Sequence, residues 1–234
     1  ITPHSYAGYG GGAKIVAVGV AGIETLAANH ARTLVAAGRG VGCVEGNECR
    51  ADLEEIAAMA GLRFIVNGVV NSRRELVGLV AGDPLCAHRA GVELARRVYA
   101  TPLPPPADVA LFNAYPKDTD LLQSSNAFNA VASDPRRALK PTGTALLTSA
   151  CSKGLGVHYL EGTAMRGYVT HRPVDYRLLL YSPNLSPPEA AQVYPEVPFC
   201  SCWEQVLQVL TARHGSRATV TVFPCAAIQI PATA

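Results

Sequence analysis

The residues best suited to chemistry gather near the start of this 234-residue chain. His4 precedes a turn, Gly8 to Gly12, in which four of five residues are glycine, and Lys14 and His30 follow it. Glycine lets backbone N–H groups come close to a phosphate or a planar ligand. A desolvated lysine can attack a carbonyl-like carbon, and histidine can move a proton or bind a borderline metal. The pattern indicates a ligand site, although such turns and single histidines are also commonly structural.

Two familiar phosphate-binding motifs do not fit this turn. The P-loop requires Gly-Lys-Ser/Thr, but Ala13 separates the last glycine from Lys14. The spacing Gly8-x-Gly10-x-x-Ala matches the dinucleotide-binding pattern, which needs a strand before the glycines and a helix after them. Too few residues precede Gly8 for that strand, and the apolar run over 14–19 predicts a strand where the helix should be.

The elements predicted around these residues would hold them in place. Residues 22–37 predict a helix, because Leu26, His30, Leu34 and Ala37 recur at helical spacing. His30 would then lie on a helix face, which is a rigid place for a ligand. The later pattern predicts a helix over 52–60 with Ile56 and Met59 inward, a hairpin of strands over 63–70 and 75–80, and a helix from Asp83-Pro84 to about Val98, in which His88 is structural or exposed.

A proline-rich stretch from Thr101 to Ala107 divides the chain. Prolines this dense stiffen the backbone and cannot join the interior of a sheet. We therefore predict a first domain over 1–98, a linker over 99–107, a second domain over 108–224 and a tail over 225–234.

The second domain alternates strands and helices, which predicts a mainly parallel sheet flanked by helices. Strands are expected over 108–113, 143–150, 176–181 and 218–223, and helices over 120–132, 186–191 and 203–213. The loops 115–118 and 151–156 would lie at the carboxyl edge of the sheet, where such sheets bind ligands. The fold class is thus α/β, with two α/β domains.

Composition restricts the class of protein. Hydrophobic residues make up 49% and charged residues 16%, as in ordinary globular proteins, and the formal net charge is +2. This charge gives no reason to expect nucleic acid or a membrane surface as a partner. No run is long enough to span a bilayer and no signal peptide is evident, so we predict a cytoplasmic location. The seven cysteines lack a zinc spacing, which predicts reduced thiols; the Cys200–Cys202 pair is the alternative, as a metal- or redox-sensitive site.

Several motifs together resemble one family. The core Ala-Gly-Tyr-x-Gly-Gly-Ala-Lys ending at Lys14, with His4 before it and Asn29-His30 after it, is similar to the nickel-pincer-nucleotide lactate racemase family. The resemblance covers residues 4 to 160 well and the rest loosely. It continues through Glu45-Gly46-Asn47, Arg50-Ala51-Asp52-Leu53, Phe64-Ile65-Val66-Asn67, Val80-Ala81-Gly82-Asp83-Pro84, Ala87-His88-Arg89-Ala90-Gly91-Val92 and Tyr115-Pro116-Lys117-Asp118.

The resemblance implies an isomerase that racemises or epimerises 2-hydroxy acids by reversible hydride transfer at C2. Lys14 matches the lysine that holds the pyridinium-derived mononucleotide, and His30 matches the histidine that completes the nickel coordination. His4 matches one of two histidines that exchange a proton with the substrate hydroxyl. The tail over 225–234 would pack back on the first domain. The implied cofactor-binding residues are Lys14, Gly10, Gly11 and Gly12.

The chain begins with Ile1 rather than methionine, in what should be the middle of an active site. We therefore expect it to be the carboxy-terminal part of a longer protein. In the family, the second histidine and the basic residues that grip the nucleotide phosphate belong to the amino-terminal portion. The expected partners are that missing portion and a small 2-hydroxy acid, and the chain alone is expected to lack the cofactor and turnover.

The sequence departs from the family pattern where the family's lactate enzyme carries Tyr-Gln-x-x-Lys. The matching positions are Leu122, Gln123 and Asn126. Gln123 is kept, but an amide replaces the lysine that could pair with a carboxylate, so a larger or more polar 2-hydroxy acid, or a sugar acid, is expected. Lys117 and Lys153 are candidates to supply the lost charge. Gly10 also differs, since the family often has serine there.

Two alternatives to the racemase interpretation stay open. A relative with the same fold could run another hydride-transfer or isomerisation reaction. The chain could also be a non-enzymatic anion- or nucleotide-binding module, in which Gly8 to Gly12 hold the anion. Replacing Lys14 with arginine separates the module from the enzymes, since a binding loop needs only the charge.

Overall fold

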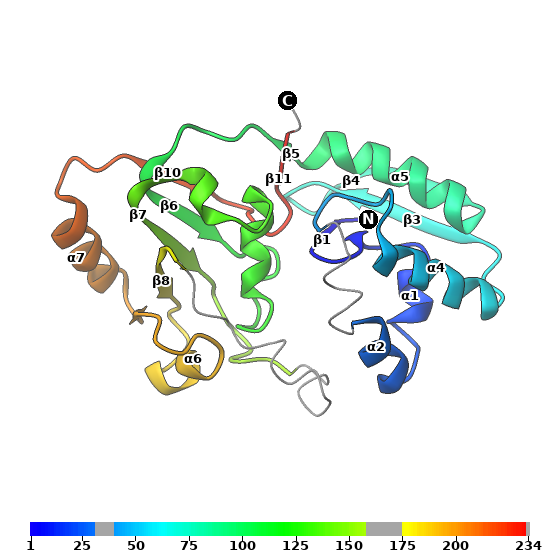
Figure 1. The fold of residues 1–234 in the computed structure, drawn as a ribbon, viewed down its shortest axis with the longest axis horizontal. Helices are drawn as coiled ribbons and strands as arrows, with labels where there is room; N and C mark the ends of the chain where they lie inside the picture. Colours follow the sequence, from blue (N-terminus) through cyan, green and yellow to red (C-terminus); the bar gives the residue numbers. More distant parts are fainter. Residues whose placement is uncertain (31–39, 158–174, 233–234) are drawn as a thin grey trace. The chain divides into compact units, whose positions relative to one another are not determined.

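The computed structural model describes residues 1–30, 40–157 and 175–232, which form two compact units (Figure 1). Unit 1 holds the described residues of Ile1–Ala100, and unit 2 holds those from Thr101 onward. Each unit has a buried core of its own. Within the described ranges, no helix combines the length and apolar character needed to cross a bilayer.

Unit 1 surrounds the glycine-rich turn with short elements and one longer helix. Its elements are β1 (Pro3–His4), β2 (Gly8–Tyr9), α1 (Lys14–Ala17), α2 (Ile23–Asn29), α4 (Glu48–Met59), β3 (Ile65–Val70), β4 (Leu76–Gly82) and α5 (Pro84–Tyr99). β1 and β2 pair as an antiparallel hairpin, and α4 packs on both α1 and α2. A small core that includes Ala17, Cys49 and Leu53 joins α1 to α4.

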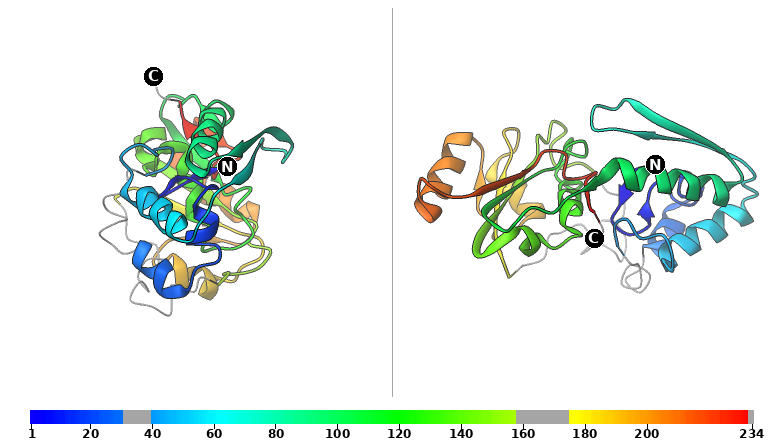
Figure 2. Two further views of the ribbon diagram at one scale, coloured as in Figure 1. Left: turned by 90° about the vertical axis from the view of Figure 1, so that its right-hand side faces the viewer. Right: turned by 90° about the horizontal axis from the view of Figure 1, so that it is seen from above.

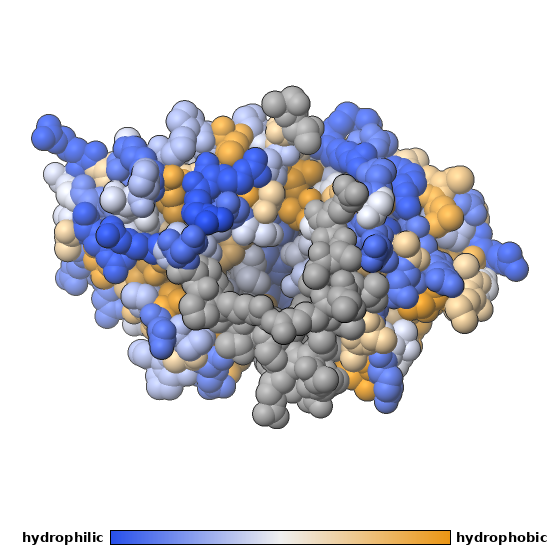
Figure 3. Space-filling view, viewed as in Figure 1, coloured by the Kyte–Doolittle hydropathy of each residue, from blue (hydrophilic) through white to orange (hydrophobic). Residues whose placement is uncertain are grey.

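The strand predicted over residues 14–19 is wrong, because α1 occupies most of this run. Only Ala17 of this helix is buried, whereas Ile15 is 60% exposed. The backbone N–H groups in this run bond to nearby carbonyls of the turn and helix, so they need no neighbouring strand. Figure 3 shows hydrophobic surface over α1 and α2, where the side chains of Ile15, Val20 and Ile23 are exposed.

The two helices predicted next are present with different limits. α2 lies within the predicted range 22–37, whose later residues fall outside the described ranges. α4 begins before the predicted start because Asn47 caps it by accepting the Arg50 N–H. Met59 was expected to face inward and is 82% exposed, since the helix buries the face of Cys49, Leu53 and Ala57 instead.

β3 and β4 form the predicted antiparallel hairpin, which runs alongside α5 (Figure 2). α5 starts as the sequence predicts: Asp83 accepts the N–H groups of Leu85 and Cys86, and Pro84 occupies the first turn. His88 of this helix is 1% exposed. Of the two predicted outcomes for His88, structural or exposed, the buried one holds.

Unit 2 is built on a five-stranded parallel sheet, which confirms the predicted fold class (Figure 1). The strand order is β10-β6-β7-β8-β9, and every neighbouring pair is parallel. Its elements are β6 (Ala107–Asn113), the 3₁₀ helices η1 (Ser124–Val131) and η2 (Pro135–Ala138), β7 (Leu139–Thr148), β8 (Arg177–Tyr181), α6 (Pro187–Val193), β9 (Phe199–Cys200), α7 (Trp203–His214), β10 (Val220–Phe223) and β11 (Ile230–Pro231), with β5 (Ala100–Thr101) at the boundary of the units.

Both faces of this sheet are covered. On one face Leu146 shares a core with Val206 of α7. On the other, Leu147 shares a larger core with Phe128 of η1 and Val193 of α6. Successive residues of a strand point to opposite faces, so the apolar run of β7 is what a sheet buried on both sides requires.

One predicted helix of unit 2 differs in detail from the sequence prediction, and the prediction for its C-terminal tail stays untested. The helix predicted over 120–132 is the 3₁₀ helix η1, in which Asn126 Nδ2 donates to the Gln123 carbonyl and so competes with the backbone for it. Residues 225–232 belong to unit 2, where the Ala232 N–H donates to the Thr101 carbonyl. Packing of this tail on the first domain concerns the placement of the two units and stays a prediction.

Candidate active site

A buried arginine organises the glycine-rich turn. Arg50 of α4 is 1% exposed. Its guanidinium donates to the carbonyl oxygens of Ala7 at 3.2 Å and Gly11 at 3.3 Å, and also to that of Tyr9. These bonds offset the cost of removing the charge from water. Burial lowers the pKa of Arg50 to about 10, so the guanidinium remains charged at neutral pH.

His88 and Asn67 hold the same turn from other elements. The Nε2–H of His88 donates to the Gly10 carbonyl at 3.0 Å, while its Nδ1 accepts from Arg89 at 3.1 Å. Asn67 Oδ1 accepts the N–H of Gly12 at 2.7 Å. Burial, followed by the charge of Arg50, lowers the pKa of His88 to about 4, which keeps the ring neutral.

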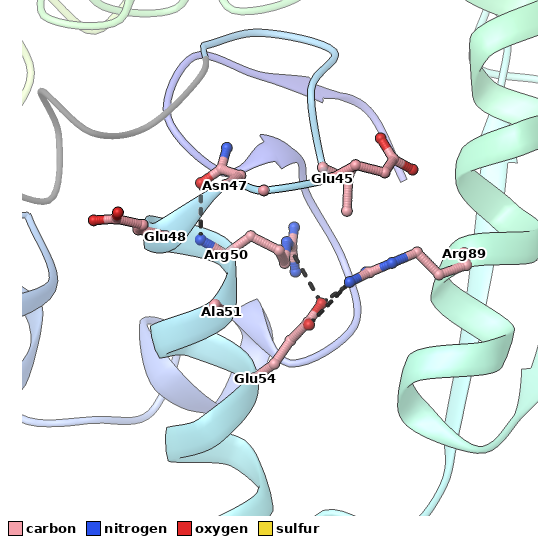
Figure 4. Close-up of a pocket in the computed structure, with 9 residues that line it drawn as sticks. Glu45, Asn47, Glu48, Arg50, Ala51, Glu54 and Arg89 are labelled. Carbon is pink, nitrogen blue, oxygen red and sulfur yellow. Dashed lines mark hydrogen bonds and ion pairs between the residues drawn. The ribbon is translucent and has the colours of Figure 1, made fainter.

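A carboxylate joins these groups at the wall of a cavity of about 450 Å³ (Figure 4). Glu54 accepts from Arg89 at 2.7 and 3.0 Å and lies 4.0 Å from the Nε of Arg50. Figure 4 shows Glu54 between the two guanidiniums, whereas Glu48 points away from them. We call Arg50, Glu54, Arg89 and His88 the Arg50 network. Its two guanidiniums share one carboxylate and the His88 ring is neutral, so the network keeps a net positive charge.

Close packing explains why two residues of the turn are glycine. Gly11 and Gly12 have φ values of +77° and +59°, and a Cβ on Gly12 would lie 2.9 Å from the His88 ring. The N–H groups of Tyr9, Gly10 and Gly12 already bond within the protein. The turn therefore does not present a row of unbonded N–H groups to a phosphate, which weakens the anion-binding alternative.

Lys14 is the first residue of α1, directly after this turn. Its amine makes no hydrogen bond or ion pair with the described residues. Burial lowers the pKa of Lys14 and the charge of Arg50 lowers it further, while Cys49 acts in the opposite direction. An amine in such surroundings is a stronger nucleophile near neutral pH than a surface lysine.

His30 caps the C-terminus of α2 and is 7% exposed. Its Nδ1 lies 3.0 Å from the carbonyl oxygen of Leu26. A carbonyl only accepts, so Nδ1 carries the proton and the lone pair of the neutral ring is on Nε2. Histidines that bind metals are commonly fixed in this way by a backbone carbonyl. His30 is therefore arranged as an Nε2 ligand.

His4 has the opposite tautomer. Its Nδ1 accepts the N–H groups of Tyr6 at 3.3 Å and Ala7 at 3.1 Å, so Nε2 carries the proton of the neutral ring. The Tyr6 ring lies between the two histidines, with its centroid 6.1 Å from that of His4 and 6.2 Å from that of His30. In this state His4 donates at Nε2, and it can take up a further proton only after Nδ1 leaves the two N–H groups.

Tyr6 thus contacts both His4 and His30. Lys14 begins α1, whereas His30 lies directly after the end of α2 and not on the predicted helix face; both helices pack on α4. In the described ranges no three His, Cys, Asp or Glu side chains gather as a metal site. A metal bound at His30 would therefore need further ligands besides these side chains.

The predicted substrate residues lie in unit 2 and bond to one another. Lys117 Nζ donates to Asn126 Oδ1 at 3.3 Å, and Asn126 Nδ2 donates to Gln123 Oε1 at 3.1 Å. All three are half-buried, whereas Lys153 is exposed. An ammonium therefore lies beside the position where the family has its lysine, and it belongs to Lys117.

Sequence patterns did not single out Arg50, Asn67 or His88 as site residues. The spacing of Arg50 and Glu54 predicts an ordinary helical ion pair, which is typical of an exposed face and gives no sign of burial. The only signal was that all three lie in stretches that resemble family motifs. Their contacts depend on how α4, β3 and α5 meet the turn.

Comparison with known proteins identifies the family. Residues 1–42 match the family model described as the lactate racemase N-terminal domain. The lactate racemase of Thermoanaerobacterium thermosaccharolyticum is 31% identical over 159 residues, and that of Lactiplantibacillus plantarum is 27% identical over 159 residues. Each alignment covers 67% of this chain and 36% of the relative, so the chain spans about a third of the length of these relatives.

Two solved structures share the fold. The lactate racemase apoprotein from T. thermosaccharolyticum gives a TM-score of 0.75 at 20% identity, covering 99% of this chain and 61% of that chain. A crystal structure of a Thermotoga maritima protein gives a TM-score of 0.62 at 14% identity, covering 96% and 63%. At these identities the two structures support the fold alone. The family model and the curated relatives show that this chain belongs to the lactate racemase family.

Proposed function

We propose that this protein racemises or epimerises a small 2-hydroxy acid. The observation that carries the proposal is that Lys14 and His30 lie at the ends of two helices, α1 and α2, that both pack on α4. Burial lowers the pKa of Lys14, and the Leu26 carbonyl fixes the lone pair of His30 on Nε2. Relatives that are named lactate racemases support the same assignment.

The residues fit a nickel-pincer nucleotide, the cofactor that the family resemblance implies. Lys14 would hold its organic part, through a thioamide where the link is covalent, and His30 would bind the nickel through Nε2. A lone imidazole needs further donors, and two sulfurs and a carbon from the cofactor with one imidazole suit Ni(II). When bound, this group supplies an acceptor for the hydride at C2 of the substrate.

The chain's own residues would bind the substrate and handle its proton. His4 would donate its Nε2–H to the C2 oxygen. To act as the base it must first release Nδ1 from the Tyr6 and Ala7 N–H groups. Lys117, which donates to Asn126, would bind the carboxylate in place of the family's lysine. A different cation at this point supports a 2-hydroxy acid other than lactate as the substrate.

The test uses the product of the complete gene that encodes this chain, loaded with the nickel-pincer nucleotide. Chiral chromatography would follow a panel of 2-hydroxy and sugar acids, while elemental analysis and intact mass would report nickel and a covalent adduct. We expect His30→Ala to lose nickel and Lys14→Arg to lose both adduct and turnover. Lys140→Arg is the matched control, because Lys140 pairs with Asp108 in unit 2.

Loaded protein that inverts no acid of the panel would contradict the proposal. So would full turnover in Lys14→Arg, which keeps the charge but not the amine. A further variant addresses the substrate. Asn126→Lys is expected to raise activity on lactate relative to larger acids, since it restores the family's cation.

A further inference from the structure

The Arg50 network bonds to the turn at several consecutive points. Arg50 donates to the carbonyls of Ala7, Tyr9 and Gly11, and His88 donates to the carbonyl of Gly10 between them. The carbonyls of Ala7 and Tyr9 belong to the hairpin of His4, and those of Gly10 and Gly11 lie between this hairpin and the first residue of α1. The place of Lys14 is therefore set by side chains from α4 and α5.

The other members of the network fix the His88 ring and balance part of the charge of Arg50. Glu54 accepts two bonds from Arg89, whose guanidinium also donates to His88 Nδ1. Because Arg89 donates there, His88 must carry its proton on Nε2 and present it to the Gly10 carbonyl. Glu54 is also the carboxylate nearest to Arg50, at 4.0 Å. One carboxylate thus serves two guanidiniums, and Arg50 keeps a positive charge that only part of this carboxylate balances.

We infer that Arg50 is a positioning residue for Lys14: it fixes the turn that precedes α1 and holds a positive charge on α4, the helix packed against α1. This inference deepens the proposed function, in which Lys14 must present a neutral amine to the organic part of the cofactor. An uncharged amine is the reactive form in such a bond-forming step. A network that only stabilised the turn would need the hydrogen bonds but not the charge next to Lys14.

The charges around Lys14 agree with this role. The groups that act on it from α4, the helix packed against α1, are Arg50 and Cys49. Arg50 favours loss of the Lys14 proton, Cys49 opposes it, and burial acts in the same direction as Arg50. Arg50 itself stays protonated near neutral pH, so its effect persists over the range in which Lys14 would react.

The test measures how readily Lys14 reacts as a function of pH, and it needs no cofactor. Trace acetic anhydride labels the 234-residue chain, and peptide mass spectrometry gives the pH midpoint for Lys14. We expect Arg50→Met to raise this midpoint by about 0.5–1 pH unit, because a nearby positive charge is lost. Arg50→Lys should leave it within about 0.3 unit, since the charge is kept. Arg73→Met, at an exposed ion pair in the β3–β4 turn, should leave it unchanged.

Glu54→Gln guards against misreading an unfolded variant. It removes the carboxylate that partly balances Arg50, so we expect the Lys14 midpoint to fall by about 0.3–0.5 pH unit. Unfolding would move the midpoint the other way, toward that of an ordinary lysine near 10.4. An unchanged midpoint in folded Arg50→Met, or a rise in Glu54→Gln that circular dichroism shows to be folded, would overturn the inference. Either result leaves the racemase proposal standing, because that proposal is tested by turnover and nickel content.

Discussion

Backbone groups decide which nitrogen of each histidine carries the proton. A carbonyl holds the proton of His30 on Nδ1, whereas two N–H groups leave that of His4 on Nε2. The first ring is thereby suited to a metal and the second to a substrate oxygen. The two tautomers come from local contacts at the end of α2 and in the turn after β1, so they exist before any ligand binds.

His88 should make stability fall in mild acid. Its pKa is about 4 in the folded protein, below the ordinary value of 6.5. The unfolded chain therefore takes up a proton as the pH drops below 6.5, while the folded chain does not until the pH nears 4. We expect the free energy of unfolding to decrease over this window by roughly 2–3 kcal/mol from His88 alone. Urea unfolding at several pH values would measure it.

The control for that experiment is His88→Gln, which keeps an N–H donor for Gly10 but does not titrate. Its stability should depend less on pH between 6.5 and 4 than that of the natural chain. Equal slopes in the two proteins would show that His88 is not the titrating group.

Gly8 should tolerate a methyl group much less well than Gly61. Their φ values, +72° and +79°, are alike, so alanine is strained at both. At Gly8 the new Cβ would lie 2.2 Å from the backbone oxygen of Cys43, whereas at Gly61 nothing lies within 4 Å. We expect Gly61→Ala to cost about 1 kcal/mol and Gly8→Ala at least about 2 kcal/mol more. Thermal unfolding of the two variants would separate the cost of the positive φ, which both share, from the cost of the clash with Cys43. Equal losses of stability would contradict the close contact at Gly8.

At the scale of elements, α4 is the support of unit 1. It packs on α1 and α2 and carries Arg50. Its cap, Asn47, also bonds to earlier segments of the chain. Asn47 is 2% exposed, and its amide donates to the carbonyls of Tyr6 at 2.6 Å and Cys43 at 2.9 Å. The side chain of Asn47 therefore both caps α4 and holds the chain before it through hydrogen bonds.

Two substitutions at Asn47 should separate its role as the helix cap from its hydrogen bonds to Tyr6 and Cys43. Asn47→Asp keeps the acceptor for the Arg50 N–H but loses both donors, whereas Asn47→Ala loses every bond. We expect alanine to cost about 2–4 kcal/mol, because a cap and two buried hydrogen bonds disappear. Aspartate should also be destabilising, since its carboxylate would face two carbonyl oxygens. Chemical unfolding would measure both, and a neutral Asn47→Ala would refute this account of α4.

Element patterns were most informative where neighbours in sequence are neighbours in space. Four strands of unit 2 (β6, β7, β8 and β10) follow from apolar runs, and the start of α5 follows from capping and proline, whereas the two-residue strand β9 was not predicted. The prediction of a strand after Lys14 was wrong. The β-branched residues of this run favour a strand, but the segment packs on α4 as a helix through one small residue, Ala17. Arg50 was missed for a similar reason. Its burial depends on carbonyls more than 30 residues away, which no local pattern records.

At the scale of the whole molecule, two cores can be examined separately. The only tryptophan, Trp203, lies in α7 of unit 2 and contacts Tyr181 with ring centroids 5.5 Å apart. Its fluorescence therefore reports on the sheet of unit 2. The glycine-rich turn and its lysine lie in unit 1 and need other probes.

Leu147→Ala should lower the unfolding midpoint seen by Trp203. Leu147 of β7 is fully buried in the core that it shares with η1, and a cavity there costs about 2–5 kcal/mol. Leu207→Ala is the matched control, since that side chain is 50% exposed and α7 tolerates alanine. Similar midpoints for the two variants would mean that the described core does not hold unit 2 together.

The cysteines offer a site at which a second fluorescent probe can be attached. Cys86 at the start of α5 is exposed, whereas Cys49, Cys151 and Cys200 are buried, and burial raises the pKa of each of these three thiols. A thiol that stays protonated reacts slowly, so an acceptor dye should attach first at Cys86. Energy transfer from Trp203 to that dye would then run from unit 2 to unit 1. Its efficiency would follow any change in the separation of the units when the proposed ligands are added.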